Sequence, residues 1–335
     1  MSELLIGLLG VALATNQGPA VSNFIQKQTG IAITVPDKND PVEREYQKLL
    51  QMDDEAQEEV DKWIKEQKSS SEKGVPNVSL DARIQQRFDP VKKAYDTFLL
   101  KYPNHARARL AYGSFLNDIH EEQEGLAQWE KARELDPKEP AAWNNLANYY
   151  GHNGPMEKAF EYYTRAIELK PTEALYYENF ATTVYLFRRD ATNYFKINEQ
   201  QVFEKAMALY HKAQELDPNN FLLASDIAQT YYGISAPKTA DPEADRKAAQ
   251  KWTDEALAAW RRALDLARDD IERQGVLVHL ARVQINAGKF DEAKKNLNAV
   301  TNEMFAPMKR NLTRKLENKA AVTTEPRTSA LPAAP

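Results

Sequence analysis

The side chains that most often catalyse reactions or bind metal ions are few in this sequence and are not grouped. There is no cysteine, and the histidines are scattered along the chain, as His105, His120, His152, His211 and His279. His120 and Glu121 begin the zinc-binding pattern H-E-x-x-H, but residue 124 is a glutamate, so the second ligand is missing. We therefore interpret the histidines as solvated polar side chains and expect no metal site.

Motifs of nucleotide-binding and hydrolytic enzymes are absent from the sequence. It contains no G-x-x-x-x-G-K-[ST], no G-x-G-x-x-G and no G-x-S-x-G. The polar side chains that could surround a small ligand lie in two segments and are Arg188, Arg189, Tyr194, Asp241, Glu243 and Asp245. No nucleophile–base pair or metal-ligand spacing accompanies them. We therefore expect a protein that is not an enzyme and has no cofactor, with a small-ligand site under these segments as the weaker alternative.

The bulk composition narrows the class of partner. The formal net charge is −5 and the sequence pI is about 5.7. A nucleic-acid-binding protein needs a basic face to neutralise phosphates, so we expect no nucleic-acid partner. The mean hydropathy is −0.65, which predicts a soluble protein without a membrane span. We expect a cytoplasmic location.

An apolar run stands near the start of the chain, at residues 3–15, ELLIGLLGVALAT. It is shorter than the roughly 20 residues that a membrane span needs. A signal peptide is the alternative, because residues 12–14 form an A-x-A site; however, the start of the segment carries Glu3 and no basic residue. We favour a helical hairpin over residues 1–39 that buries the run against the rest of the protein or a second subunit. Export through a weak signal, and a membrane-surface anchor, are the alternatives.

Amphipathic patterns resume after this segment. Asp40, Pro41 and Glu43 have the residue types of a helix start, and two apolar stripes then predict a helical pair over residues 40–67. Residues 68–79 are polar with Gly and Pro, which predicts a linker. Helical pattern returns at Leu80, restarts at Asp89-Pro90, and continues as a solenoid over residues 80–301.

One unit is repeated through this solenoid region. Residues 140–171 contain two helical patterns separated by the turn residues 151–155, and the second pattern ends at Pro171. A unit of this kind cannot bury its own apolar face and must stack on neighbours. The second helices of successive units align at Ala132, Ala166, Ala213, Ala263 and Val300, each preceded by an apolar residue, respectively Trp129, Tyr163, Tyr210, Trp260 and Leu297.

Two units are longer than the others, by 13 and 16 residues in the turn between their helices. The insertions lie near residues 187–199 and 234–250, and we expect them to meet on one edge of the solenoid. Asn198 with Gln201, and Asp241 with Pro242, predict helix starts, the second of a long helix over 242–267. An amphipathic pattern then predicts a capping helix over 302–319, and the composition predicts a disordered tail over 320–335.

The 34-residue period, with its W-x2-L…Y…A-x3-Y…A…P spacing at 140–173, resembles the tetratricopeptide repeat (TPR) family. The resemblance covers about residues 106–301. It implies an all-α fold, a right-handed α-solenoid of stacked antiparallel helix pairs, here with an N-terminal helical extension. It also implies a scaffold or adaptor that binds a protein or peptide, because members mostly bind other proteins and share no chemistry.

In this family the first helix of each pair lines a concave groove that usually takes extended peptides or partner helices. The resemblance therefore implies partner-binding positions on the first helices. They are Ser114, Asn117, Asn144, Asn148, Glu178, Thr182, Tyr185, Ser225, Gln229, Tyr232, Val278, Arg282 and Ile285. Asn side chains can hydrogen-bond a peptide backbone, and Tyr adds rigid apolar area with a polar tip. A clamp for a chaperone's C-terminal carboxylate is not expected, because Leu110 stands where its lysine would be.

A second function of a different class stays open. The apolar residues 3–28 could dock on a neighbouring subunit, which would make this a self-assembling structural protein. The solution masses of the full chain and of a chain that begins at Asp40 test this hypothesis, and finding a monomer in both cases would exclude it.

Overall fold

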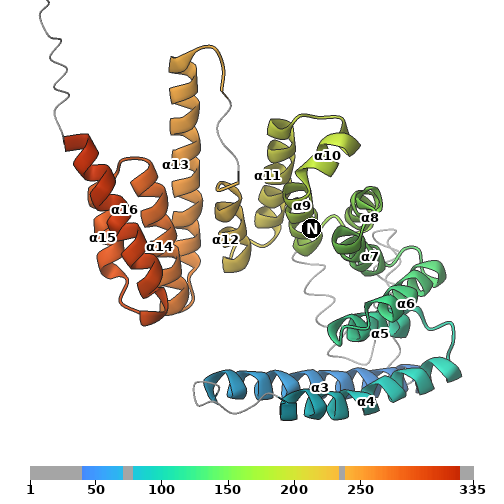
Figure 1. Cartoon of the computed structure of the whole chain (residues 1–335). Helices are drawn as coiled ribbons and strands as arrows, with labels where there is room; N and C mark the ends of the chain where they lie inside the picture. The colour runs from blue at the N-terminus through green and yellow to red at the C-terminus, as the bar shows by residue number, and fades with distance from the viewer. Residues whose placement is uncertain (1–39, 71–77, 234–237, 325–335) are drawn as a thin grey trace, which may run out of the picture. The chain divides into compact units, whose positions relative to one another are not determined.

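The computed structural model describes residues 40–70, 78–233 and 238–324, and in these ranges all regular secondary structure is helical (Figure 1). The predicted all-α class is confirmed. The described residues divide into two compact units, and the division falls between Leu146 and Ala147. The N-terminal hairpin expected over 1–39 lies outside the described residues.

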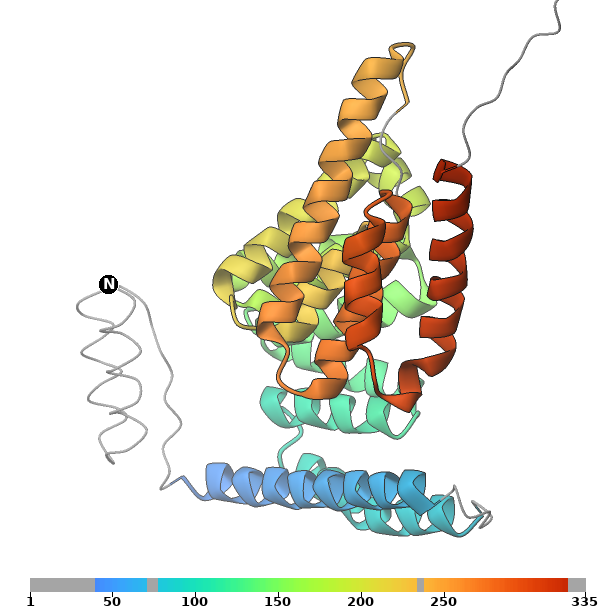
Figure 2. The ribbon, with the colours of Figure 1, turned by 90° about the vertical axis from the view of Figure 1, so that its left-hand side faces the viewer.

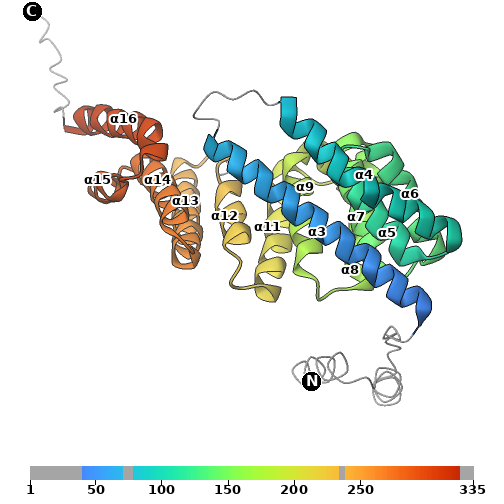
Figure 3. The ribbon, with the colours of Figure 1, turned by 90° about the horizontal axis from the view of Figure 1, so that it is seen from below.

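The first unit begins with two long helices, α3 (Pro41–Ser70) and α4 (Val78–Lys101), which lie side by side (Figure 3). They are followed by the pair α5 (Ala106–Asp118) and α6 (Glu122–Leu135) and by the start of α7 (Pro140–Asn153). Asp40 accepts a hydrogen bond from the Val42 amide at 2.9 Å, so the predicted start of the first helix is confirmed.

The helical pair predicted over residues 40–67 is wrong, because α3 is one helix of 30 residues. Asp53 does not end it. Its buried carboxylate accepts a hydrogen bond from the Tyr95 hydroxyl on α4 at 2.6 Å, so this polar residue is held on the packed face of the helix. The expected linker is also shorter than 68–79, since α3 runs to Ser70 and α4 begins at Val78; residues 71–77 lie outside the described ranges. The helix α4 passes through Pro90 without a break.

The Asp53–Tyr95 pair is expected to stabilise the first unit. Burial raises the pKa of Asp53, although the Tyr95 hydrogen bond favours its charged form. Replacing Tyr95→Phe removes the donor and leaves a buried acceptor unsatisfied, which costs about 1–3 kcal/mol. Chemical denaturation of the full chain measures this loss. In an Asp53→Asn background the same Tyr95→Phe change should cost less, because a neutral amide is easier to bury; an equal cost in both backgrounds would contradict the role of the charge.

The second unit contains three further antiparallel pairs. They are α9 (Ala174–Leu186) with α11 (Glu199–Leu216), α12 (Phe221–Thr230) with α13 (Pro242–Leu266), and α14 (Asp270–Asn286) with α15 (Phe290–Ala299). They follow the end of α7 and α8 (Met156–Leu169). The aligned positions of the predicted second helices are all buried, from Ala132 to Val300, as are the larger residues three before them. Alanine at four of these positions lets the paired helices approach closely, whereas the fifth, Val300, follows the last residue of α15.

The first insertion forms a short helix, α10 (Arg188–Phe195). The rings of Tyr194 and Phe195 turn back onto Phe160 of α8, each with centroids 5.3 Å apart. Asn198 and Gln201 form the predicted reciprocal cap at the start of α11. The aromatic side chains of this insertion thus pack against the second helix of the preceding repeat, although Tyr194 stays 41% exposed.

The second insertion lengthens α13 to 25 residues, against 10 for its partner α12. Asp241 caps it by accepting from the Glu243 amide at 2.9 Å, as predicted. Figure 2 shows the N-terminal part of α13 extending beyond the neighbouring helices. Residues 234–237, between α12 and α13, lie outside the described ranges.

The last repeat is covered by a short 3-10 helix (Glu303–Phe305) and by α16 (Ala306–Thr324). Phe305 and Leu312 are buried there, in one apolar cluster with Ala281 and Leu297. The predicted capping helix over 302–319 differs from α16 at both ends. The helix begins at Ala306, after the 3-10 turn, and it ends at Thr324, five residues into the segment expected to be disordered. The remainder of that tail, 325–335, is outside the described residues.

Candidate functional site

Three first helices of the second unit, α9, α12 and α14, carry most of the predicted partner-binding positions. Tyr232, the second residue after α12, lies near Arg282 of α14, with the guanidinium 5.5 Å from the centre of the tyrosine ring. The two residues are 50 positions apart in sequence, so only the packing of α12 against its neighbours places them in contact. This pair is the centre of the candidate site.

Two further residues complete what we call the Tyr232 cluster, namely Tyr232, Trp260, His279 and Arg282. His279 stacks on the buried Trp260 ring with centroids 4.3 Å apart and planes 5° apart. The Tyr232 hydroxyl lies 3.1 Å from His279 Nδ1. Tyr232 remains 39% exposed, so the cluster presents a fixed aromatic surface to solvent.

The electrostatics of the cluster leave it with one charge at neutral pH. Burial, together with the nearby Arg282 guanidinium, lowers the pKa of His279 to about 4. Burial likewise raises the pKa of Tyr232 to about 12. His279 and Tyr232 are therefore neutral, and the charge is that of Arg282, which makes no ion pair within the described residues.

Tyr185 of α9 lies beside the residues that follow α12 and so extends the surface of the Tyr232 cluster to α9. Its hydroxyl occupies the space that a side chain at position 233 would need, so a Cβ added to Gly233 would overlap it. Burial raises the pKa of Tyr185. Because Gly233 adjoins Tyr232, this contact brings Tyr185 next to the Tyr232 cluster. Thr182, one turn earlier on α9, shares a hydrogen bond of 2.9 Å with the Tyr210 hydroxyl.

Two half-buried carboxylates lie on the first helices of two successive repeats, Glu178 on α9 and Asp226 on α12. Burial raises the pKa of both, and the Asp226 carboxylate raises that of Glu178 further. The exposed Gln229 side chain donates to Asp226 at 3.4 Å. The surface of α9 and α12 is therefore polar and acidic, in contrast to the aromatic and cationic Tyr232 cluster.

The other predicted positions differ in how accessible they are. Asn117 is exposed, and the partly exposed Asn148 accepts a hydrogen bond from the Tyr163 hydroxyl at 2.6 Å. Asn144 is only 3% exposed and Val278 and Ile285 are buried, so these three do not lie on an open surface as the sequence interpretation required. Helix α14 has apolar residues on nearly every side because α13, α15 and α16 all pack on it.

The interpretation of all histidines as solvated side chains was wrong for two of them. His279 is part of the Tyr232 cluster, and His105 accepts a hydrogen bond from the Ala108 amide at 3.0 Å, where it caps α5. A signal for His279 exists in the sequence, because it lies three residues before Arg282 and thus on the same side of a helix. The repeat alignment indicates Trp260 as a packing residue, but nothing near it in the sequence indicates its contact with His279.

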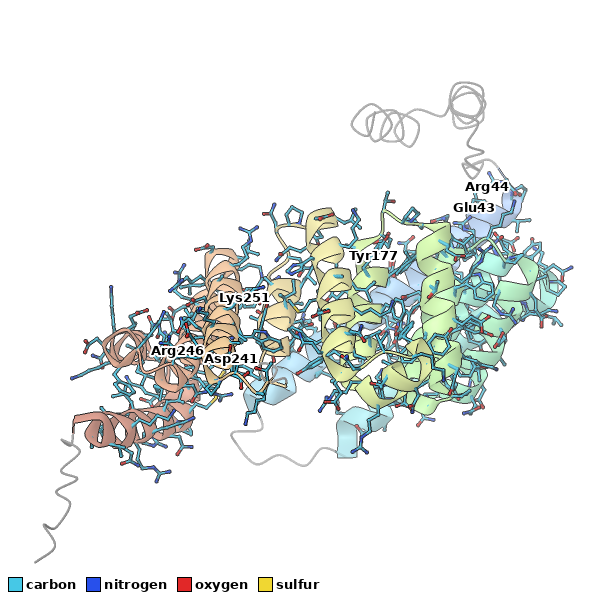
Figure 4. All side chains as sticks on the ribbon, turned by 90° about the horizontal axis from the view of Figure 1, so that it is seen from above. Glu43, Arg44, Tyr177, Asp241, Arg246 and Lys251 are labelled. Carbon is cyan, nitrogen blue, oxygen red and sulfur yellow. The ribbon has the colours of Figure 1, made fainter. Side chains whose placement is uncertain are left out.

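The described residues contain no group of three or more His, Asp or Glu side chains that could hold a metal ion. In the same ranges, no helix combines the length and the apolar character that crossing a membrane requires. The residues of the alternative small-ligand site are divided between α10 and the N-terminal part of α13. Figure 4 shows Asp241, Arg246 and Lys251 along that part of α13.

Comparison with known proteins gives one family match. Residues 123–174, which include α7, α8 and all of α6 except its first residue, match the model of the tetratricopeptide repeat. No curated protein sequence matches the chain.

Several crystal structures are similar to this one, among them those of two TPR proteins. YrrB, a TPR protein with an unusual peptide-binding site, is 13% identical, with a TM-score of 0.48 over 67% of this chain and 99% of its own. MamA is 20% identical, with a TM-score of 0.40 over 57% of this chain and 99% of its own. TTC0263, a thermophilic TPR protein of Thermus thermophilus, is 18% identical, with a TM-score of 0.41 over 64% of this chain and 99% of its own.

Proposed function

Since residues 123–174 match the tetratricopeptide repeat, we propose that the second unit of this chain binds an extended segment of a partner protein on α9, α12 and α14. Repeat proteins of this family are interaction scaffolds, and their surfaces follow from the stacking of repeats. The proposed role is therefore binding without catalysis.

The observation that carries the proposal is the Tyr232 cluster. Its aromatic rings are held by stacking and hydrogen bonding before any partner arrives, so little side-chain entropy is lost on binding. Tyrosine and arginine are also enriched among residues that dominate the energy of protein interfaces. A guanidinium without an ion pair, beside an exposed ring, offers both a charge and apolar area to a peptide.

Polar groups on the neighbouring helices support an extended partner. Thr182 and Gln229 can form hydrogen bonds with a peptide backbone, and Tyr185 adds ring area next to Tyr232. Glu178 and Asp226 favour a basic side chain of the peptide on the α9 and α12 side. The chemistry of the preferred peptide is therefore mixed, with a basic group near α9 and an acceptor group near Arg282.

The test is a selection of peptides from a random displayed library against the full chain, followed by calorimetric titration of a selected peptide. Arg282→Gln and Tyr232→Ala are each expected to weaken its binding at least tenfold, since each removes a central contact. The control is Arg246→Gln, which removes an exposed charge from α13 (Figure 4) and should leave the affinity unchanged. A library that yields no binding peptide, or a peptide insensitive to both variants, would contradict the proposal.

A further inference from the structure

The second unit also contains a groove that lies apart from the Tyr232 cluster. A groove of about 640 Å³ lies between α11, α12 and α13. None of the residues of the Tyr232 cluster lines it. Its two walls are the second helices of adjacent repeats, so it is separate from the surface that we propose for an extended partner.

The floor of the groove is apolar. Phe203 stacks on Trp252 with centroids 4.7 Å apart, and Tyr231 packs against both rings at 5.7 and 6.2 Å. Met207 and Ile227 are also part of the floor. Burial and the adjacent Glu255 carboxylate raise the pKa of Tyr231 to about 12, so its ring is an uncharged part of this surface.

The rim of the groove is charged and exposed. It contains Glu204 and His211 on the α11 side and Lys251 on the α13 side, where Figure 4 shows it. An apolar floor within a polar rim is the usual anatomy of a protein-binding surface. Two small exposed residues, Ala208 and Ala258, lie on the opposite walls and leave the space between them open.

The chain itself contains a segment suited to such a groove, outside the described residues. Seven of the ten residues from 4 to 13 are Leu, Ile or Val, and no charged residue occurs between Glu3 and Lys27. An uncovered run of this kind promotes aggregation, so a soluble protein needs a surface that covers it. In a helical conformation its 13 residues would measure about 20 Å, against about 27 Å for the 18 residues of α11.

We propose that residues 3–15 of one copy of this chain dock in the groove between α11 and α13 of a second copy. Twenty-four residues separate this segment from Asp40, enough for a reach of about 80 Å when extended. The segment of a second copy can therefore reach the groove while both folded parts stay apart. The contact is heterologous, since the donated segment and the groove are different surfaces, so each copy can give one segment and accept another.

The experiment measures the mass of the full chain by sedimentation over a range of concentrations. Wild type is expected to exceed its 38.1 kDa monomer mass increasingly with concentration. The segment variant Leu5→Asp/Leu9→Asp and the groove variant Ala208→Glu/Ala258→Glu should each weaken association at least tenfold. Both groove positions are exposed, so these substitutions leave the core untouched. The matched control is Ala244→Glu/Ala249→Glu, which adds the same charge to exposed positions of α13 outside the groove.

Mixing the two variants tests the pairing itself. The groove variant keeps an intact segment and the segment variant keeps an intact groove, so an equimolar mixture should form a dimer that neither forms alone. A monomeric wild type, as expected if the segment is removed as a signal or inserted in a membrane surface, would overturn the proposal. So would a groove variant that associates like wild type, or a mixture that stays monomeric. Binding of peptides at the Tyr232 cluster is measured separately and does not depend on this result.

Discussion

Replacing Trp260→Ala is expected to destabilise the second unit by about 3–5 kcal/mol, the usual cost of removing a large buried aromatic side chain. Trp260 is 1% exposed and lies in the apolar cluster formed by α12, α13 and α14. Its removal leaves a cavity under His279, because the two rings are stacked at 4.3 Å. Urea denaturation of the full chain, followed by circular dichroism, measures the loss.

Trp252→Ala provides the comparison within the same helix. Trp252 is only partly buried and borders the groove between α11 and α13, so its surroundings can be filled by water. We expect a loss of about 1–2 kcal/mol, mainly from the contact with Phe203. Equal losses for the two tryptophans would contradict the assignment of Trp260 as the packing centre of this repeat.

The second large effect concerns acid stability and His279. Its pKa is about 4 in the folded protein, below the usual value near 6.5 for an exposed histidine. Between these values the unfolded chain binds a proton that the folded chain does not bind, so the free energy of unfolding falls as the pH falls from 6.5 toward 4. The ring is partly exposed, so solvent screening reduces this contribution to about 1–2 kcal/mol.

The variant His279→Gln isolates this contribution. Other groups of the unit act in the opposite sense, since Glu178 and Asp226 have raised pKa values and bind protons more tightly in the folded state. The comparison is therefore the difference between wild type and variant, measured by denaturation at pH 7 and pH 4.5. The variant should lose about 1–2 kcal/mol less than wild type between these pH values. Parallel losses would show that His279 does not titrate as its surroundings imply.

Much of the helical architecture could be predicted from the sequence because its signals are local. Asp40, Asn198 and Asp241 start helices through hydrogen bonds to amides two or three residues away. The aligned residues of the second helices follow the 3.6-residue period that a buried helix face requires. Each signal lies within one helix or one repeat, so it needs no knowledge of which helices become neighbours.

The limits of α3 show where local signals fail. Asp53 and Asp54 resemble the start of a new helix, yet α3 continues through them because Tyr95, 42 residues later, satisfies the Asp53 carboxylate. The burial of Asn144, Val278 and Ile285 is a similar case. A helical period identifies which residues share a side, but the number of neighbours that pack on a helix decides how many sides are buried.

The sequence by itself determined the helical repeat, its capped insertions and the absence of catalytic motifs, since these depend on residue types at short spacing. Only the tertiary structure decided the candidate site. Tyr185 meets Gly233, and Tyr232 joins Trp260, His279 and Arg282, through the packing of α9, α12, α13 and α14. The low pKa of His279 has the same origin, because desolvation depends on what surrounds a side chain in space and not on its neighbours along the chain.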